Sequence, residues 1–177
     1  MSSMQAAYFS PDKPEPIKKI IMGWVKENSQ KVSRIHQFGY GWEAWLQADL
    51  GYRLAVQLNG AGLRRETFVY NDLRRVDLNI YGNAGPTQPW HLFEFKCKTP
   101  TQNTIEFLRG LLDDWDKLED VVIGKDHARL WAVGFWVDDD MGKPNDNRLA
   151  NWNFEKGNGV NVMWRSWYSP KPTARLS

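Results

Sequence analysis

The sequence predicts an α/β fold in which helices flank a mixed β-sheet. Apolar residues recur at helical spacing in the first third of the chain, short strand-like segments follow, and one more amphipathic helix separates two of these segments. The length of 177 residues suits one ordinary domain, so we expect residues 1–177 to form a single unit. Residues 1–13 are a loose lead-in and residues 169–177 a basic tail.

Three helices are expected. The first covers Ile17 to Ser29, where apolar side chains recur at helical spacing. The second runs from Trp42 to Leu58 with an apolar residue at every fourth position, and Gly60 and Gly62 should end it. The third follows Pro100, has an acidic outer face, and carries its apolar stripe on Ile105, Leu108, Leu111, Leu112, Trp115 and Leu118.

Five segments are expected to be strands: Thr67–Tyr70, Arg74–Ile80, Trp90–Cys97, Ala128–Val137 and Val160–Tyr168. The Gly- and Pro-rich residues 82–89 form a turn, so the second and third segments should pair as neighbours. The segment Ala128–Val137 is almost wholly apolar, which is typical of a buried strand. Residues 138–159 are polar and should form a loop.

Composition limits the class of protein. Apolar residues make up 42% and charged residues 25%, as in globular domains. A net charge of +2 gives no whole-molecule signal for a polyanion partner. With one cysteine, no intramolecular disulfide can form, and no apolar stretch is long enough to cross a bilayer. We therefore expect a protein without a membrane partner, cytoplasmic or delivered to a target cytoplasm by a dedicated secretion system.

Two of the expected strands carry charged residues on one face. Side chains alternate along a strand, so Asp77 lies opposite the face that bears Val76, Leu78 and Ile80. In the next strand Glu94 and Lys96 share the face opposite Phe93, Phe95 and Cys97. If both apolar faces point into one core, Asp77, Glu94 and Lys96 converge on the other side of the sheet. Two carboxylates beside one ammonium can hold a hard divalent cation and organise a water molecule.

The second helix adds a carboxylate. At 100° per residue, Glu43 falls between Leu46 and Leu54 on the apolar stripe, with Gln47 beside it. A buried carboxylate needs a cation or a shared proton. Glu43 at the start of a helix is also explained by the helix dipole. Likewise, Asp77, Glu94 and Lys96 are explained as solvent-facing residues in salt bridges.

Other polar residues give weaker signals. The histidines His36, His91 and His127 lack the spacing of a zinc site. Cys97 lies on the expected core face and is a small buried hydrophobe rather than a nucleophile. Asp113, Asp114 and Asp116 are expected on a solvated helix face rather than in a metal site.

These residues together resemble the PD-(D/E)XK nuclease superfamily, whose fold is that of restriction endonucleases. The family pattern is a Glu on the first core helix, an Asp on one strand, an (Asp/Glu)-x-Lys on the next, then a helix and a strand. Its counterparts here are Glu43 in GWEAWLQ, Asp77 in RRVDLNI, and Glu94 and Lys96 in FEFK. Val76 stands where the family pattern has proline. The resemblance spans about residues 42–137 and implies a restriction-endonuclease-like sheet with an αβββαβ core.

The resemblance implies a Mg²⁺- or Mn²⁺-dependent nuclease that hydrolyses phosphodiester bonds, with DNA as the favoured substrate. Asp77, Glu94 and the carbonyl of Phe95 would bind the metal, while Glu43 would bind a second ion or a metal-bound water, with Gln47 behind it. Lys96 would orient the attacking water and help to deprotonate it, or donate to the phosphate. Nucleic-acid contacts are expected, besides Gln47, from Arg64, Arg65, Arg74 and Arg75, whose other explanation is ordinary surface solvation. Exposed tryptophans, from the ten in the chain, could stack on bases.

Three functions stay open on the sequence. The first is a metal-dependent nuclease, which in this compact form resembles a stand-alone enzyme or a small antibacterial DNase toxin with a cognate inhibitor protein. The second is a non-catalytic module of the same fold that binds nucleic acid through its arginines and tryptophans. The third is a protein-interaction domain, such as a toxin-neutralising or scaffold protein, with tryptophans as interface anchors.

Overall fold

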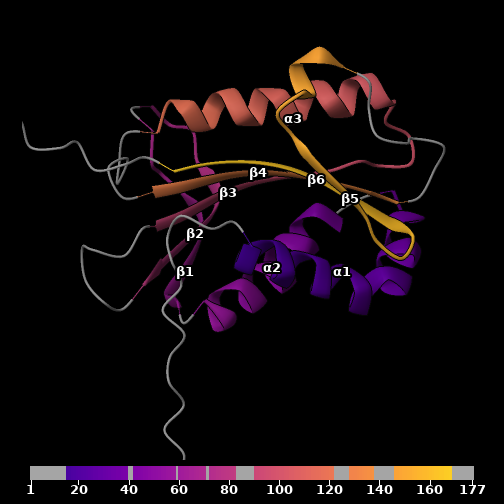
Figure 1. Cartoon of the computed structure of the whole chain (residues 1–177), viewed down its shortest axis with the longest axis horizontal. Helices are drawn as coiled ribbons and strands as arrows, with labels where there is room; N and C mark the ends of the chain where they lie inside the picture. Colours follow the sequence, from indigo (N-terminus) through magenta and orange to yellow (C-terminus); the bar gives the residue numbers. More distant parts are fainter. Residues whose placement is uncertain are drawn as a thin grey trace, which may run out of the picture.

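The computed structural model describes residues 15–39, 42–58, 60–70, 72–82, 90–121, 128–137 and 146–168. In these residues a six-stranded sheet lies between two helical layers (Figure 1). Helices α1 (Glu15–His36) and α2 (Trp42–Gln57) cover one face, and α3 (Thr104–Glu119) covers the other. The predicted α/β class with helices on a mixed sheet is confirmed.

The sheet has the strand order β1-β2-β3-β4-β6-β5. Its strands, in chain order, are β1 (Gly60–Thr67), β2 (Val76–Gly82), β3 (Trp90–Cys97), β4 (Ala128–Val137), β5 (Asn153–Lys156) and β6 (Val160–Tyr168). Strands β3 and β4 are parallel and are joined through α3, while every other neighbouring pair is antiparallel. The predicted pairing of the segments that bear Asp77 and Glu94 as neighbours is therefore confirmed, and the pair is antiparallel.

Each face of the sheet has its own hydrophobic core. On the side of α1 and α2, the helix stripes pack on Leu78, Phe93 and Phe95, among others. On the side of α3, residues such as Phe107 and Leu111 pack on Leu92 and Trp136. Strand β4 is buried on both faces, as its apolar sequence predicted. Seven of the ten tryptophans are buried in these cores: Trp24, Trp42, Trp115, Trp131, Trp136, Trp152 and Trp164.

The strand expected at Thr67–Tyr70 is wrong. The strand lies earlier, at Gly60–Thr67, and Glu66 near its end has a positive φ of 51°. This strand forms the edge of the sheet, and its eight residues, GAGLRRET, include two glycines and four polar residues. The apolar pattern that predicts a strand is therefore missing. The polar stretch 138–159 was also expected to be a loop, but it contains β5 and the 3-10 turn η2 (Asn147–Leu149).

Smaller differences concern single positions. Val76 packs in the core on the α3 side, whereas Leu78 and Ile80 pack on the α2 side, although all three were expected on one face. Ile105 is largely exposed rather than in the apolar stripe of α3. Helix α1 extends beyond Ser29 to His36.

The lead-in 1–13, the turn 83–89, His127 and the tail 169–177 lie outside the described residues. Within the described residues, none of the helices combines the length and apolar character needed to cross a membrane.

Candidate functional site

The site begins where β2 and β3 part. Their register pairs Leu78 with Phe93 and continues to Ile80 opposite His91. Beyond Leu78, the Asp77 carboxylate fills the place of a strand partner, because its Oδ2 accepts a hydrogen bond of 2.7 Å from the backbone N–H of Phe95. The carbonyl of Phe95 points to the same side of the strand as its N–H. Asp77 and the Phe95 carbonyl therefore face the same opening in the sheet.

Helix α2 brings Glu43 to the same edge of β3. Two hydrogen bonds join the start of this helix to the end of the strand: Trp42 Nε1 donates to the Lys98 carbonyl (3.3 Å), and Glu43 Oε2 accepts from the Cys97 N–H (2.8 Å). Glu43 is partly buried, as its place in the apolar stripe predicted. The Cys97 N–H that donates to Glu43 lies two residues along β3 from the Phe95 N–H that donates to Asp77. Both acids therefore line the unpaired edge of this strand.

Glu94 lies on the α3 face of the sheet and is only 1% exposed. Its Oε1 receives two hydrogen bonds, one from the Tyr70 hydroxyl (2.8 Å) and one from the Lys117 ammonium (2.7 Å). Tyr70 comes from the β1–β2 connection and Lys117 from α3. Three separate segments therefore meet at this carboxylate.

Lys96 follows Glu94 on the same face of β3. Its side chain runs along α3 at Gly110, where a Cβ atom would lie 3.0 Å from Lys96 Cε. The amine is attracted by Asp114, Glu43 and Asp77. The structure thus gathers the four residues that the sequence singled out, Glu43, Asp77, Glu94 and Lys96, around one end of β3.

Burial perturbs the acids of this cluster. It raises the pKa of Glu94 to about 9, with Asp77 adding repulsion and Lys117 opposing it. Burial also raises the pKa values of Glu43 and Asp77. For Lys96, burial opposes the charge, but the surrounding carboxylates outweigh it and raise the pKa of the amine. Acidic groups whose pKa is raised because burial disfavours the charged form are typical of functional sites.

The cluster contains more acidic than basic groups. Glu43, Asp77, Glu94 and Asp114 contribute four carboxyl groups, while Lys96 and Lys117 contribute two ammonium groups. Because burial raises the pKa of Glu94 to about 9, this carboxyl group retains its proton near pH 7 without a metal. A divalent cation would favour its charged form, and carboxylate and carbonyl oxygens are the ligands that Mg²⁺ prefers. No group of three or more His, Cys, Asp or Glu side chains is placed to hold a metal in the described part of the chain. Mg²⁺ needs fewer, because it binds through one or two carboxylates and keeps several waters. The chemistry of Asp77, Glu94 and the Phe95 carbonyl therefore fits this ion.

The expected nucleic-acid contacts divide between the two faces. Arg64 pairs with Asn79 in register, so it shares the face of Asp77, and it lies 5.5 Å from the Tyr81 ring. Arg65 donates to Gln47 of α2 at 2.7 Å, on the opposite face. In the β1–β2 connection, Arg74 is paired with Asp72 and Asp120. Arg75 is exposed, and its guanidinium lies 4.5 Å from the Phe68 ring.

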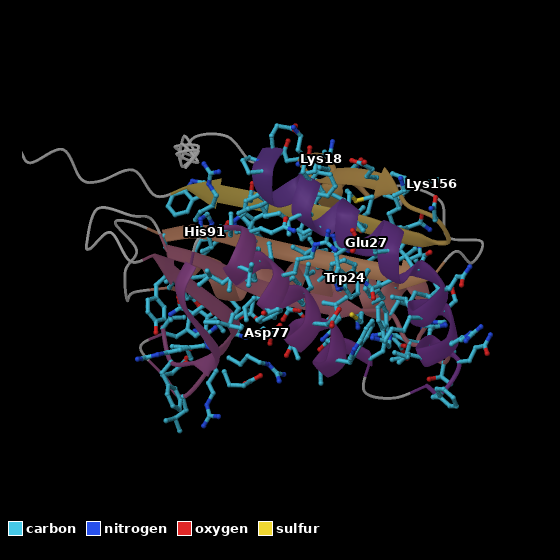
Figure 2. All side chains as sticks on the ribbon, turned by 90° about the horizontal axis from the view of Figure 1, so that it is seen from below. Lys18, Trp24, Glu27, Asp77, His91 and Lys156 are labelled. Atoms are coloured by element: carbon cyan, nitrogen blue, oxygen red, sulfur yellow. The ribbon has the colours of Figure 1, made fainter. Side chains whose placement is uncertain are left out.

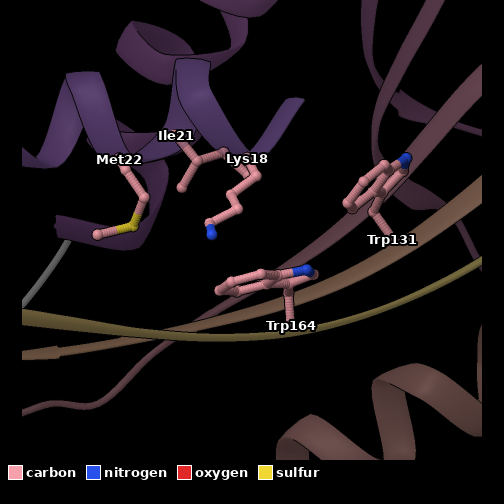
Figure 3. A pocket seen from close by; sticks show the side chains of 5 residues that line it. All are labelled: Lys18, Ile21, Met22, Trp131 and Trp164. Carbon is pink, nitrogen blue, oxygen red and sulfur yellow. The ribbon is translucent and has the colours of Figure 1, made fainter. Parts of the chain in front are cut away.

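The other features that could bind a ligand lie away from this cluster of acids and lysines. Among the described side chains, Trp167 is the one clearly exposed tryptophan, at 43%. A narrow gap with no room for a water molecule lies between α1 and the sheet and is lined by Lys18, Ile21, Met22, Trp131 and Trp164 (Figure 3). It is on the α1 face, away from Glu94. Asp77 in β2 and Lys156 in β5 lie toward opposite edges of the sheet (Figure 2).

Three residues of the cluster were missed in the sequence. Tyr70 lies in an irregular segment, where no periodicity predicts its direction. Asp114 was expected on a solvated face, but it is partly buried and its pKa is raised to about 6, chiefly by burial. On the helical wheel it lies about 40° from Leu118, at the border of the apolar stripe of α3, whereas Glu43 lies within the stripe of α2. Lys117 follows three residues later.

Comparisons with protein-family models, with curated proteins and with solved structures found no match to this chain.

Proposed function

We propose that this protein is a metal-dependent nuclease that hydrolyses phosphodiester bonds, with DNA as its substrate. One observation carries the proposal: Glu94 is buried and Asp77 half-buried on one face of the sheet where β2 and β3 part, and Lys96 lies beside them. The element order α2-β1-β2-β3-α3-β4 supports a PD-(D/E)XK-like core, since it matches the αβββαβ pattern of that superfamily.

Each residue of the site would have a separate role in hydrolysis. Asp77, Glu94 and the Phe95 carbonyl would hold Mg²⁺, which lowers the pKa of a bound water and offsets charge on the phosphate. Lys96, surrounded by carboxylates, would act as an ammonium that orients the water and donates to the phosphate. Glu43 would hydrogen-bond a water at the site or contribute to a second ion. Arg64 and Arg75 would contact the nucleic-acid backbone.

A second candidate function has its own support. Asp77 and Glu43 each accept a backbone N–H of β3, so both carboxylates also act as caps of an unpaired strand edge. A module of this architecture could bind nucleic acid through its arginines without cleaving it. Binding of that kind is salt-dependent and does not require Glu94.

The test is cleavage of plasmid and linear DNA, and of RNA, in Mg²⁺, in Mn²⁺ and in EDTA. Wild type is expected to cut in either metal and not in EDTA, whereas Asp77→Asn, Glu94→Gln and Lys96→Met are expected to lose at least 100-fold. Asp116→Asn and Lys26→Met replace exposed residues and control for the substitutions and for contaminating nucleases. DNA binding without cleavage by wild type would favour the second candidate. Undiminished cleavage by Asp77→Asn or Lys96→Met would overturn the proposed site.

A further inference from the structure

One stripe of α3 faces the charged residues of β3. Helix α3 packs on β3 and β4, and Gly110, Asp114 and Lys117 follow one another at spacings of four and three residues. Residues at these spacings lie on one side of a helix. Lys117 contacts Glu94 at 2.7 Å, and Gly110 contacts Lys96. Asp114 is therefore held between the two points at which α3 touches the site.

Gly110 leaves room for the Lys96 side chain to pass along α3. A Cβ atom at Gly110 would lie 3.0 Å from Lys96 Cε, 3.7 Å from Cδ and 3.9 Å from Nζ. Glycine weakens the interior of a helix relative to alanine, so close approach of another side chain is a physical reason for its presence there. The Lys96 side chain thus lies along this turn of α3, with its Cδ, Cε and Nζ atoms all close to Gly110.

Asp114 lies in the turn of α3 that follows Gly110. Among the carboxylates around Lys96, Asp114 exerts the strongest attraction on the amine, and Lys96 is the strongest attraction on Asp114. Its neighbours Asp113 and Asp116 are exposed. Asp114 is thus distinguished from the rest of the acidic helix by burial and by a cationic partner.

We propose that Asp114 is a positioning residue of the site: it fixes the Lys96 ammonium toward the opening between β2 and β3, along a path that Gly110 leaves free. This inference rests on the proposed nuclease function, because the position of the amine matters where it meets a phosphate or an attacking water. Asp114 acts through Lys96 and does not itself touch the substrate.

The first experiment measures DNA cleavage at saturating DNA over a range of Mg²⁺ concentrations. Asp114→Asn is expected to lower turnover about 100-fold, as misplacing a reacting group by about 1 Å does, without changing the Mg²⁺ concentration for half-maximal rate. Asp114→Glu should restore part of the rate, and Asp113→Asn should match wild type. A rise in the Mg²⁺ requirement of Asp114→Asn would instead make Asp114 a metal ligand and overturn the proposal.

The path of Lys96 has a matched test. Gly110→Ala places a methyl group against Lys96 Cε and should lower turnover, whereas Gly23→Ala in α1 meets only the end of the flexible Arg53 side chain and should not. Equal rates for Gly110→Ala and wild type would contradict the inferred path.

A second experiment needs no activity. Thermal midpoints are measured without metal for Asp114→Asn, Lys96→Met and the double variant. Since residues whose charges attract each other couple, the shift of the double variant should differ from the sum of the two single shifts. Additive shifts would overturn the proposed interaction between Asp114 and Lys96. If wild type cleaves no nucleic acid, the proposed function fails, yet this cycle still decides whether Asp114 holds Lys96.

Discussion

Replacing Glu94 with glutamine should stabilise the metal-free protein. Glutamine keeps the shape of the side chain and an oxygen for Tyr70 and Lys117, but it removes the ionisable group. The pKa of Glu94 rises from an ordinary value of 4.5 to about 9, chiefly through burial and then through Asp77. Between these values the unfolded chain has released a proton that the folded chain retains, so stability falls as the pH rises. At pH 7, which lies about 2.5 units above the ordinary value, this costs about 3 kcal/mol at about 1.4 kcal/mol per unit.

The assay is urea unfolding in EDTA from pH 4.5 to 8. Glu94→Gln should exceed wild type by about 3 kcal/mol in unfolding free energy at pH 7, and the difference should vanish toward pH 4.5. Asp116→Asn replaces an exposed acid of α3 and should change stability by no more than about 0.5 kcal/mol. If Glu94→Gln is less stable than wild type at pH 7, Glu94 is a structural partner of Lys117 and Tyr70. In that case the reasoning that links its burial to function is refuted.

Three further predictions concern packing, acid stability and nucleic-acid contacts. A Cβ at Gly134 would lie 2.8 Å from Leu111 Cδ2 and 3.0 Å from Phe107 Cζ, so Gly134→Ala should cost about 1–3 kcal/mol in urea unfolding, and an unchanged midpoint would contradict this packing of α3. Burial lowers the pKa of His91 to about 4. From pH 6.5 down to 4, the unfolded chain therefore binds a proton on His91 that the folded chain does not bind. Wild type should therefore lose up to about 3 kcal/mol relative to His91→Gln over this range, and parallel pH profiles would argue against it. Arg64→Ala and Arg75→Ala should each weaken DNA binding and reduce its salt slope by about one, whereas Arg74→Ala should change the slope little because Asp72 and Asp120 already pair with it.

The sequence predicted the elements whose burial is one-sided or complete. The stripe of α2, the alternation in β3 and that of β2 beyond Val76 repeat strictly enough that the directions of Glu43, Asp77, Glu94 and Lys96 followed from them. The edge strand β1 escaped prediction because it is largely polar and pairs on one side only, and the short β5 is likewise at an edge.

Tertiary contacts decided what local pattern could not. Tyr70 reaches Glu94 from an irregular connection, and its direction depends on how that segment packs on α3. The pairing of Arg65 with Gln47 and of Arg74 with Asp120 joins residues far apart in the chain. Asp114 was harder to predict than Glu43, because it lies at the border of the apolar stripe of α3, about 40° from Leu118, rather than within the stripe.

The most direct measurement is anomalous diffraction from crystals soaked in Mn²⁺, for wild type and for Asp77→Asn. The proposal predicts one anomalous peak in wild type, about 2.1 Å from oxygens of Asp77, Glu94 and the Phe95 carbonyl, and loss of that peak in Asp77→Asn. A wild-type crystal with no peak there, or with the ion bound only at residues away from Asp77 and Glu94, would contradict it.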